Sequence, residues 1–162
     1  MHKLLLILFL ALCLVGCNGE LNKEKQNVTS SDIFAKAKAI HTKALTLDAH
    51  ADIEIPGRPS NYVGSDGLSK VGPSKMQAGG LDAVVMAVAV GPMPRNEDGY
   101  AAAKALAQTK LKAVRALVEN KTNNSVIALS TDQLIEAEHQ GKSALILGFQ
   151  NALILGREID DI

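Results

Sequence analysis

The chain has 162 residues, enough for one domain, and 47% of them are apolar, which is ample for a hydrophobic core. Seventeen basic and seventeen acidic residues cancel to a formal net charge of zero, and aromatic residues make up only 3% of the chain. Because nucleic-acid-binding surfaces are basic and often carry stacking aromatics, we expect no nucleic-acid partner. The abundance of Ala, Leu, Ile and Val favours helices packed on a parallel sheet over an all-β sandwich.

The start of the chain is typical of a secretory leader. A short basic start precedes an apolar run over residues 4–15, which is too short to span a bilayer comfortably. The run ends in Leu14-Val15-Gly16-Cys17, which resembles the lipobox of bacterial lipoproteins. The resemblance implies a signal peptide over residues 1–16, cleavage before Cys17, and lipidation of that cysteine on its sulfur and on its new amino group. The alternative is an ordinary signal peptide that happens to contain Cys13 and Cys17.

Cleavage would leave Cys17 as the only cysteine, which excludes a disulfide framework. Because each buried methylene contributes ~0.8 kcal/mol, several acyl chains on Cys17 would form a stable membrane anchor. Residues 17–30 are polar, which predicts a flexible tether between the anchor and a domain over residues 31–162. We therefore expect a protein that is lipid-anchored to a bacterial membrane in the cell envelope and faces the periplasm or the exterior.

The first predicted helix begins at a capping residue, Ser30 or Ser31, and runs to about Lys43. Its apolar residues recur at helical spacing and predict a buried stripe made of Ile33, Ala37, Ile40 and Ala44. A strand over residues 45–52 follows, because its leucines alternate with polar neighbours.

His50 and Asp52 lie two residues apart at the end of this strand. Residues two apart on a strand point to the same face, so the imidazole and the carboxylate are expected to project together. Both groups are zinc ligands, and the carboxyl ends of strands are where parallel α/β folds place their chemistry. The alternative for an isolated His-x-Asp is a hydrogen-bonded core histidine and an aspartate that starts a turn.

The segment over residues 55–73 is rich in Gly, Pro, Ser and Asn and has no periodicity, which predicts a loop that shapes a substrate mouth. The loop residues that could contact a substrate, with nothing to single them out, are Arg58, Asn61 and Tyr62. Residues 81–90 form the clearest strand, apolar on both faces as a strand covered on both sides must be. An amphipathic helix over residues 100–119 is predicted to cover the sheet.

Three shorter elements complete the prediction: a strand over residues 125–129, a helix opened by the capping-box pair Ser130 and Gln133 and ended by Gly141, and a strand over residues 144–149. His41 and His139 lie near helix C-termini, where a cation is mildly favoured, and are expected on the surface. The alternation of strands and helices predicts an α/β fold with a parallel sheet, either doubly wound or closed into a barrel.

Three motifs in this order resemble the membrane (renal) dipeptidase family of zinc metallopeptidases: Asp48-Ala49-His50-Ala51-Asp52-Ile53, Met76-Gln77-Ala78-Gly79-Gly80-Leu81-Asp82-Ala83 and Gly148-Phe149-Gln150-Asn151-Ala152. They resemble, respectively, the family's Asp-x-His-x-Asp signature, its Gly-Gly entry into the second strand, and the place of its next metal ligand.

The resemblance covers about residues 33–162 and implies a (β/α)8 TIM-type barrel. Because such a barrel needs ~250 residues, and about 145 remain after the leader, we expect the first half of a truncated barrel. Its open strand edges would favour aggregation or a homodimer.

The resemblance also implies a chemistry: one or two Zn2+ ions, a metal-activated water, and hydrolysis of dipeptides, including those with a C-terminal D-residue. Carried over residue by residue, His50 and Asp52 are ligands of the first zinc, and Gln150 takes the place of a glutamate that bridges both metals. Gln150 is a departure that argues against the two-metal form, because a neutral amide is a poorer zinc ligand than a carboxylate. A role in capping the loop after the strand is the alternative for Gln150. The family's later histidines have no counterpart before Ile162, so this chain alone is expected to be inactive.

Two other functions stay open at this point. One is a dipeptidase-like lipoprotein that binds a small ligand without hydrolysis, and the other is a different amidohydrolase-type metal hydrolase. A His-x-His on the first strand would have favoured the latter, whereas this chain has His-x-Asp.

Overall fold

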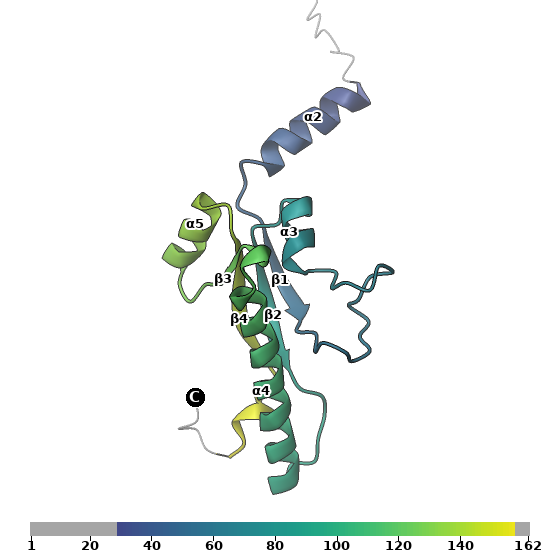
Figure 1. Ribbon diagram of the computed structural model, residues 1–162, viewed down its shortest axis with the longest axis vertical. Coiled ribbons are helices and arrows are strands. Elements are labelled where there is room, and N and C mark those ends of the chain that lie inside the picture. The colour runs from purple at the N-terminus through teal and green to yellow at the C-terminus, as the bar shows by residue number, and fades with distance from the viewer. Residues whose placement is uncertain (1–28, 158–162) are drawn as a thin grey trace, which may run out of the picture. The chain divides into compact units, whose positions relative to one another are not determined.

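A computed structural model describes residues 29–157. The predicted signal peptide, the lipobox with Cys17 and nearly all of the predicted tether therefore lie outside the described residues. The chain divides into two compact units, residues 1–35 and residues 36–162, and the second unit contains the sheet. The elements in chain order (Figure 1) are α2 (Ser30–His41), β1 (Leu47–Asp52), α3 (Pro73–Gly79), β2 (Ala83–Ala89), α4 (Glu97–Glu119), η2 (Lys121–Asn123), β3 (Ser125–Ile127), α5 (Thr131–His139), β4 (Ser143–Gln150) and η3 (Ala152–Leu155).

Helix α2 differs from its prediction in its cap and in its burial. The cap is Thr29 rather than Ser30 or Ser31: its Oγ1 accepts the Asp32 amide at 3.2 Å, and its own amide donates to the Asp32 carboxylate at 3.0 Å. This reciprocal pair is a capping box. The predicted buried stripe is wrong, because α2 has no buried residue and its two isoleucines are 59% and 60% exposed. Periodicity shows which face of a helix can be buried, whereas burial itself needs a partner surface.

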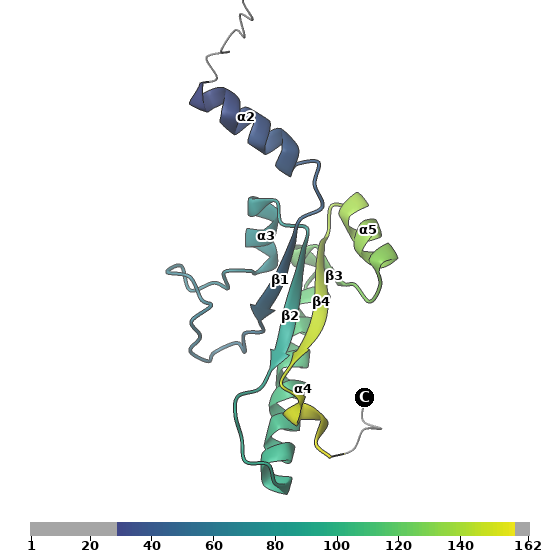
Figure 2. The ribbon, with the colours of Figure 1, turned by 180° about the vertical axis from the view of Figure 1, so that it is seen from behind.

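The four strands form one parallel sheet in the order β1-β2-β4-β3, which is the predicted α/β architecture. Strand β4 lies beside β2, although β3 precedes it in the chain (Figure 2). Strand β3 is a short edge strand, because it pairs only with residues 143–145 at the start of β4. Strands β1, β2 and β4 are therefore neighbours, as successive strands of a barrel are. The result is a partial TIM-barrel-like fold whose sheet does not close within the described residues.

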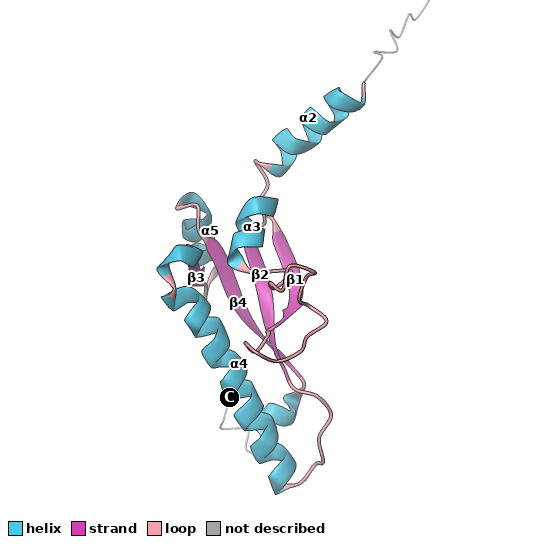
Figure 3. Ribbon diagram, turned by 45° about the vertical axis from the view of Figure 1, so that its right-hand side comes forward, coloured by secondary structure: helices cyan, strands magenta, loops and turns pink. Residues whose placement is uncertain are grey.

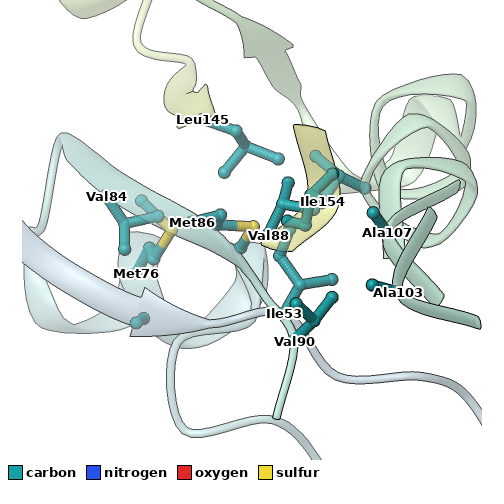
Figure 4. Packing of buried hydrophobic residues seen from close by; sticks show 12 residues of the cluster. Ile53, Met76, Val84, Met86, Val88, Val90, Ala103, Ala107, Leu145 and Ile154 are labelled. Atoms are coloured by element: carbon teal, nitrogen blue, oxygen red, sulfur yellow. The ribbon is translucent and has the colours of Figure 1, made fainter. Parts of the chain in front are cut away.

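The main core lies between β2 and α4 (Figure 4). Alternate residues of β2 face α4, and α4 presents mainly small residues to the sheet, which lets the helix approach closely; the cluster includes Val84, Met86, Val88, Ala103, Ala107 and Val114. The buried face predicted for α4 is thereby confirmed. Its start is fixed by Asn96, whose side-chain oxygen accepts the Gly99 amide at 2.9 Å.

A smaller core lies on the other face of the sheet, beneath α5, and consists of Ala83, Ala128, Ala137 and Ala144. Helices α4 and α5 thus cover opposite faces. The reason is the strand order. The connection from β2 to β3 through α4 passes over β4, and the connection from β3 to β4 through α5 runs back in the opposite direction. Right-handed crossovers that run in opposite directions place their helices on opposite faces.

Helix α3 is an element that the sequence did not predict, because the segment before it lacks hydrophobic periodicity. Its ends nevertheless carry local signals: Pro73 occupies the first turn, and Gly80 follows the helix with a left-handed φ of 68°. The left-handed backbone angle is what favours glycine here, because the nearest atom to an added Cβ, Cε1 of the exposed His41 at 2.9 Å, belongs to a side chain that can move. His41 and His139 are exposed, as predicted.

Candidate functional site

The predicted site residues lie at one edge of the sheet, where the carboxyl ends of the parallel strands β1, β2 and β4 meet (Figure 3). Asp52 pairs with Ala87 of β2, and Ala87 pairs with Gly148 of β4, so these three residues form one row across the sheet. His50 precedes this row on β1, and Gln150 lies two residues beyond it on β4. A small residue, Ala87, is thus the cross-strand neighbour of Asp52, and another, Gly148, follows on β4.

His50 and Asp52 come together as predicted, with 3.9 Å between His50 Nε2 and Asp52 Oδ1. The His50 side chain is 53% exposed and the Asp52 side chain 24%. Asp52 Oδ1 is buried and has no hydrogen-bond partner. Leaving a buried acceptor unsatisfied is costly, so this oxygen is one that a cation would stabilise. Two ligands of a tetrahedral zinc ion lie roughly 3.4 Å apart for bond lengths near 2.1 Å, so a small movement of the His50 ring fits the pair to zinc.

Gln150 lies apart from this pair. Strand β2 separates β1 from β4, which alone places the Gln150 backbone roughly 10 Å from β1. Its backbone carbonyl oxygen lies 3.5 Å from the Val90 amide, and the residue is exposed. Among residues 29–157, no three His, Cys, Asp or Glu side chains are grouped so that they could hold a metal ion. The described residues therefore bring two predicted ligands together, and metal binding by Gln150 stays a prediction.

The loop over residues 53–72 follows β1 and is held in shape by its own contacts (Figure 3). The Lys70 amide donates to the Tyr62 carbonyl at 2.8 Å, which pairs the two sides of the loop. Lys75 of α3 lies 2.8 Å from the Asp66 carboxylate, and hydrogen bonding to Lys75 lowers the pKa of that carboxyl. The loop is thus anchored to the helix that follows it, as a structured wall beside the end of β1.

Two cavities lie beneath this loop. The larger has a volume of about 550 Å³ and lies between the loop and α4; its lining includes Asp52, Ile53, Arg58, Met86 and Leu117. The smaller, of about 240 Å³, adjoins Asp52, Arg58, Tyr62 and Lys110. Because small-molecule pockets typically measure ~300–1,000 Å³, the larger cavity is big enough for a dipeptide. The prediction that this loop shapes a cavity beside the strand end agrees with these volumes.

Tyr62 is the residue that sequence analysis failed to single out. It adjoins the same cavity as Asp52, and the Asp52 carboxylate raises the pKa of the Tyr62 phenol through hydrogen bonding and through its negative charge. A tyrosine within a loop rich in Gly, Pro and Ser carries no sequence signal for such a contact. Its approach to Asp52 depends on the path of the loop, which spacing along the chain does not encode.

Comparison with known proteins decides the family. A family model described as membrane dipeptidase (Peptidase family M19) matches residues 34–162. The chain belongs to the membrane dipeptidase family. The crystal structure of the probable dipeptidase PvdM from Pseudomonas aeruginosa is similar to this chain with a TM-score of 0.67 and 21% identity, over 80% of this chain and 34% of that one. At this identity the likeness shows the fold, and the chain spans about a third of the length of that dipeptidase. A search of curated proteins finds no match.

Membership of the membrane dipeptidase family confirms the resemblance drawn from the three motifs, all of which lie within the matched residues. It also supports a fold of the barrel class. The family is generally metal-dependent, and the chemistry of the His50–Asp52 pair suits a metal ion. The individual roles of His50, Asp52 and Gln150 remain predictions.

Proposed function

We propose that this chain forms the metal-binding N-terminal part of a zinc dipeptidase, in which a metal-activated water hydrolyses the amide bond of dipeptides. One observation carries the proposal. In a member of the membrane dipeptidase family, His50 and Asp52 converge at the carboxyl edge of the sheet, and the buried Asp52 Oδ1 has no protein donor. An imidazole and an unsatisfied carboxylate oxygen in this place are what a zinc ion needs.

His50 Nε2 and Asp52 Oδ1 would hold the ion. Once bound, zinc would lower the pKa of a coordinated water toward neutrality and polarise the scissile carbonyl. The protein's part is to orient these two side chains, and the loop over residues 53–72 forms a wall beside the end of β1, with cavities that adjoin Asp52. Catalytic zinc sites usually have three protein ligands, so activity requires at least one ligand from outside the described residues.

Dipeptide hydrolysis tests the proposal. The 162-residue chain is expected to show no turnover of Ala-Ala or Ala-D-Ala, whereas a form extended by later barrel strands is expected to hydrolyse them and to lose activity with a chelator. In the extended form, His50→Ala and Asp52→Ala should each reduce activity by more than about 100-fold, the upper range for loss of a second-shell partner. His139→Ala, an exposed histidine of α5, is the matched control and should retain activity.

Two outcomes would contradict this account. Chelator-sensitive turnover by the 162-residue chain would show that its own ligands suffice. Absence of turnover by the extended form would favour the second candidate, a lipoprotein that binds a small ligand without hydrolysis. That candidate is supported by the neutral Gln150 at the position of a bridging carboxylate. It predicts dipeptide binding by calorimetry that a chelator does not abolish.

We also propose that the protein is tethered to a bacterial membrane through lipidated Cys17. The support is the lipobox of residues 14–17 after a short apolar run. Across residues 29–157, every helix is too short or too polar to cross a bilayer. Cys17→Ser should release a soluble form or stall the precursor, as measured by detergent-phase partitioning. Partitioning that is unchanged in this variant would contradict the tether.

A further inference from the structure

Strand β1 contains one more residue than β2 between two points of their pairing. Asp48 pairs with Val84 and Ala51 pairs with Met86, so β1 takes three steps where β2 takes two. The extra residue is a β-bulge, and it falls in the stretch that contains His50. A single extra residue moves every later side chain of its strand to the other face of the sheet.

The bulge decides which face Asp52 occupies. Asp48 and Ala51 both pair with β2 residues that face the α4 core, and Ala51, itself part of that core, is only 3% exposed. Asp52 is the next residue and projects from the opposite face. With unbroken alternation Asp48 and Asp52 would share a face, and Asp52 would point into the apolar core beneath α4. An ionised carboxylate is costly to bury there.

A side-chain hydrogen bond spans the bulge. Asp48 Oδ1 accepts the backbone amide of His50 at 2.9 Å. A bulge leaves the extra residue without a ladder partner, so its amide needs another acceptor. Aspartate is suited to this task, because its short side chain reaches the amide two residues further along the chain and competes with regular strand pairing.

We propose that Asp48 is a positioning residue for the metal-binding pair: by accepting the His50 amide, it stabilises the bulge that places His50 and Asp52 on the face of the sheet opposite the α4 core. The use of this pair as metal ligands rests on the proposed function. The bulge and its hydrogen bond do not rest on the proposed function, since both are present in the chain without metal. The family motif thus contains one residue that shapes the strand and two that would bind the ion.

Two substitutions separate the acceptor from the charge. Asp48→Asn keeps an oxygen acceptor in the same place and removes the charge, whereas Asp48→Leu keeps a similar size and removes the acceptor. Asp132→Leu, at an exposed aspartate in the first turn of α5, is the matched control. Two measurements by nuclear magnetic resonance without metal report the geometry: hydrogen exchange of the His50 amide relative to amides of the β2–β4 ladder, and the cross-relaxation between the Ala51 methyl group and the side chain of Met86, which the bulge places opposite each other on the α4 face.

Wild type, Asp48→Asn and Asp132→Leu should keep a protected His50 amide and the cross peaks between Ala51 and Met86. In Asp48→Leu the His50 amide should exchange at least about tenfold faster relative to the ladder, the order expected for one hydrogen bond to a charged acceptor. The cross peaks between Ala51 and Met86 should disappear, because a strand without the bulge turns Ala51 to the other face. Protection that survives Asp48→Leu, or is lost in Asp48→Asn, would overturn the proposal. If Asp48→Leu does not fold, Asp48→Asn decides alone, by retaining or losing both signals. Since no metal is present, a failure of dipeptide hydrolysis would leave this result standing.

Discussion

Replacing Asp52 with asparagine should stabilise the metal-free protein while it removes metal binding. In the absence of metal, Asp52 Oδ1 is buried without a donor, and an unsatisfied buried acceptor costs about 1–3 kcal/mol, more when it is charged. Asparagine has the same shape, lowers the desolvation cost and offers an amide N–H to the imidazole of His50, whose Nε2 lies 3.9 Å from Asp52 Oδ1 in the wild type. The Tyr62 phenol, which hydrogen-bonds to the Asp52 carboxylate, can still donate to the carbonyl oxygen of asparagine. The lost attraction to His50 is small, because that side chain is 53% exposed and exposed ion pairs contribute ~0–1 kcal/mol.

We therefore expect Asp52→Asn to raise the free energy of unfolding by about 1 kcal/mol in the presence of a chelator. Urea unfolding at pH 8 measures it. With a denaturant slope of ~1–3 kcal/mol/M, the midpoint should rise by roughly 0.3–1 M. Added zinc should then raise the midpoint of the wild type and leave that of the variant unchanged, because a ligand stabilises only a protein that binds it.

Asp66→Asn is the matched control, since it removes the same charge from a carboxylate that is paired with Lys75. Its midpoint should fall or stay the same in the chelator. A lower midpoint for Asp52→Asn than for the wild type would refute the reasoning, because it would show that the Asp52 carboxylate is a satisfied structural group rather than a site awaiting a cation.

Two further predictions concern Tyr62 and the start of the sheet. Because Asp52 raises the pKa of Tyr62 above its ordinary value of 10.0, an absorbance titration should show Tyr62 ionising above pH 10, and Asp52→Asn should lower that pKa. The stability that this contact contributes is present below pH 10 and is lost as the pH rises through the raised pKa; identical titrations in both proteins would contradict the contact. Asp82 Oδ2 accepts the amide and the hydroxyl of Thr46 at 2.7 and 2.8 Å. Asp82→Ala should therefore lower the free energy of unfolding in urea by about 2–3 kcal/mol, for two half-buried hydrogen bonds to a charged acceptor, and Asp82→Asn by about half as much. Equal losses in the two variants would show that the acceptor oxygen is not what matters.

The parts of the fold that could be predicted are those where hydrophobic pattern and burial coincide. The run over residues 81–90 predicted β2, and the apolar face of residues 100–119 predicted the packing of α4, because both elements are buried by neighbours within the chain. Helix α2 shows the opposite case, since its stripe has no partner among the described residues. The order of the strands was also beyond prediction, because the insertion of β4 between β2 and β3 is decided by pairing rather than by pattern.

The sequence predicted that His50 lies beside Asp52, but not how the strand places the pair. Strand periodicity correctly placed His50 beside Asp52, although the regular alternation assumed for the whole strand is broken by the bulge after Asp48. A bulge depends on the register with a partner strand, and a single strand's sequence does not contain that register. The contact of Tyr62 with Asp52 likewise depends on a loop whose path is set by hydrogen bonds across it.

A calorimetric titration with zinc tests the central claim most directly, namely that His50 and Asp52 form the metal-binding pair of this chain. The measurement compares the 162-residue wild type with His50→Ala, Asp52→Ala and the control His139→Ala. Two side-chain ligands predict binding far weaker than the ~10–16 kcal/mol of structural zinc sites, lost in both site variants and unchanged in the control. Tight zinc binding that survives His50→Ala would contradict the assignment.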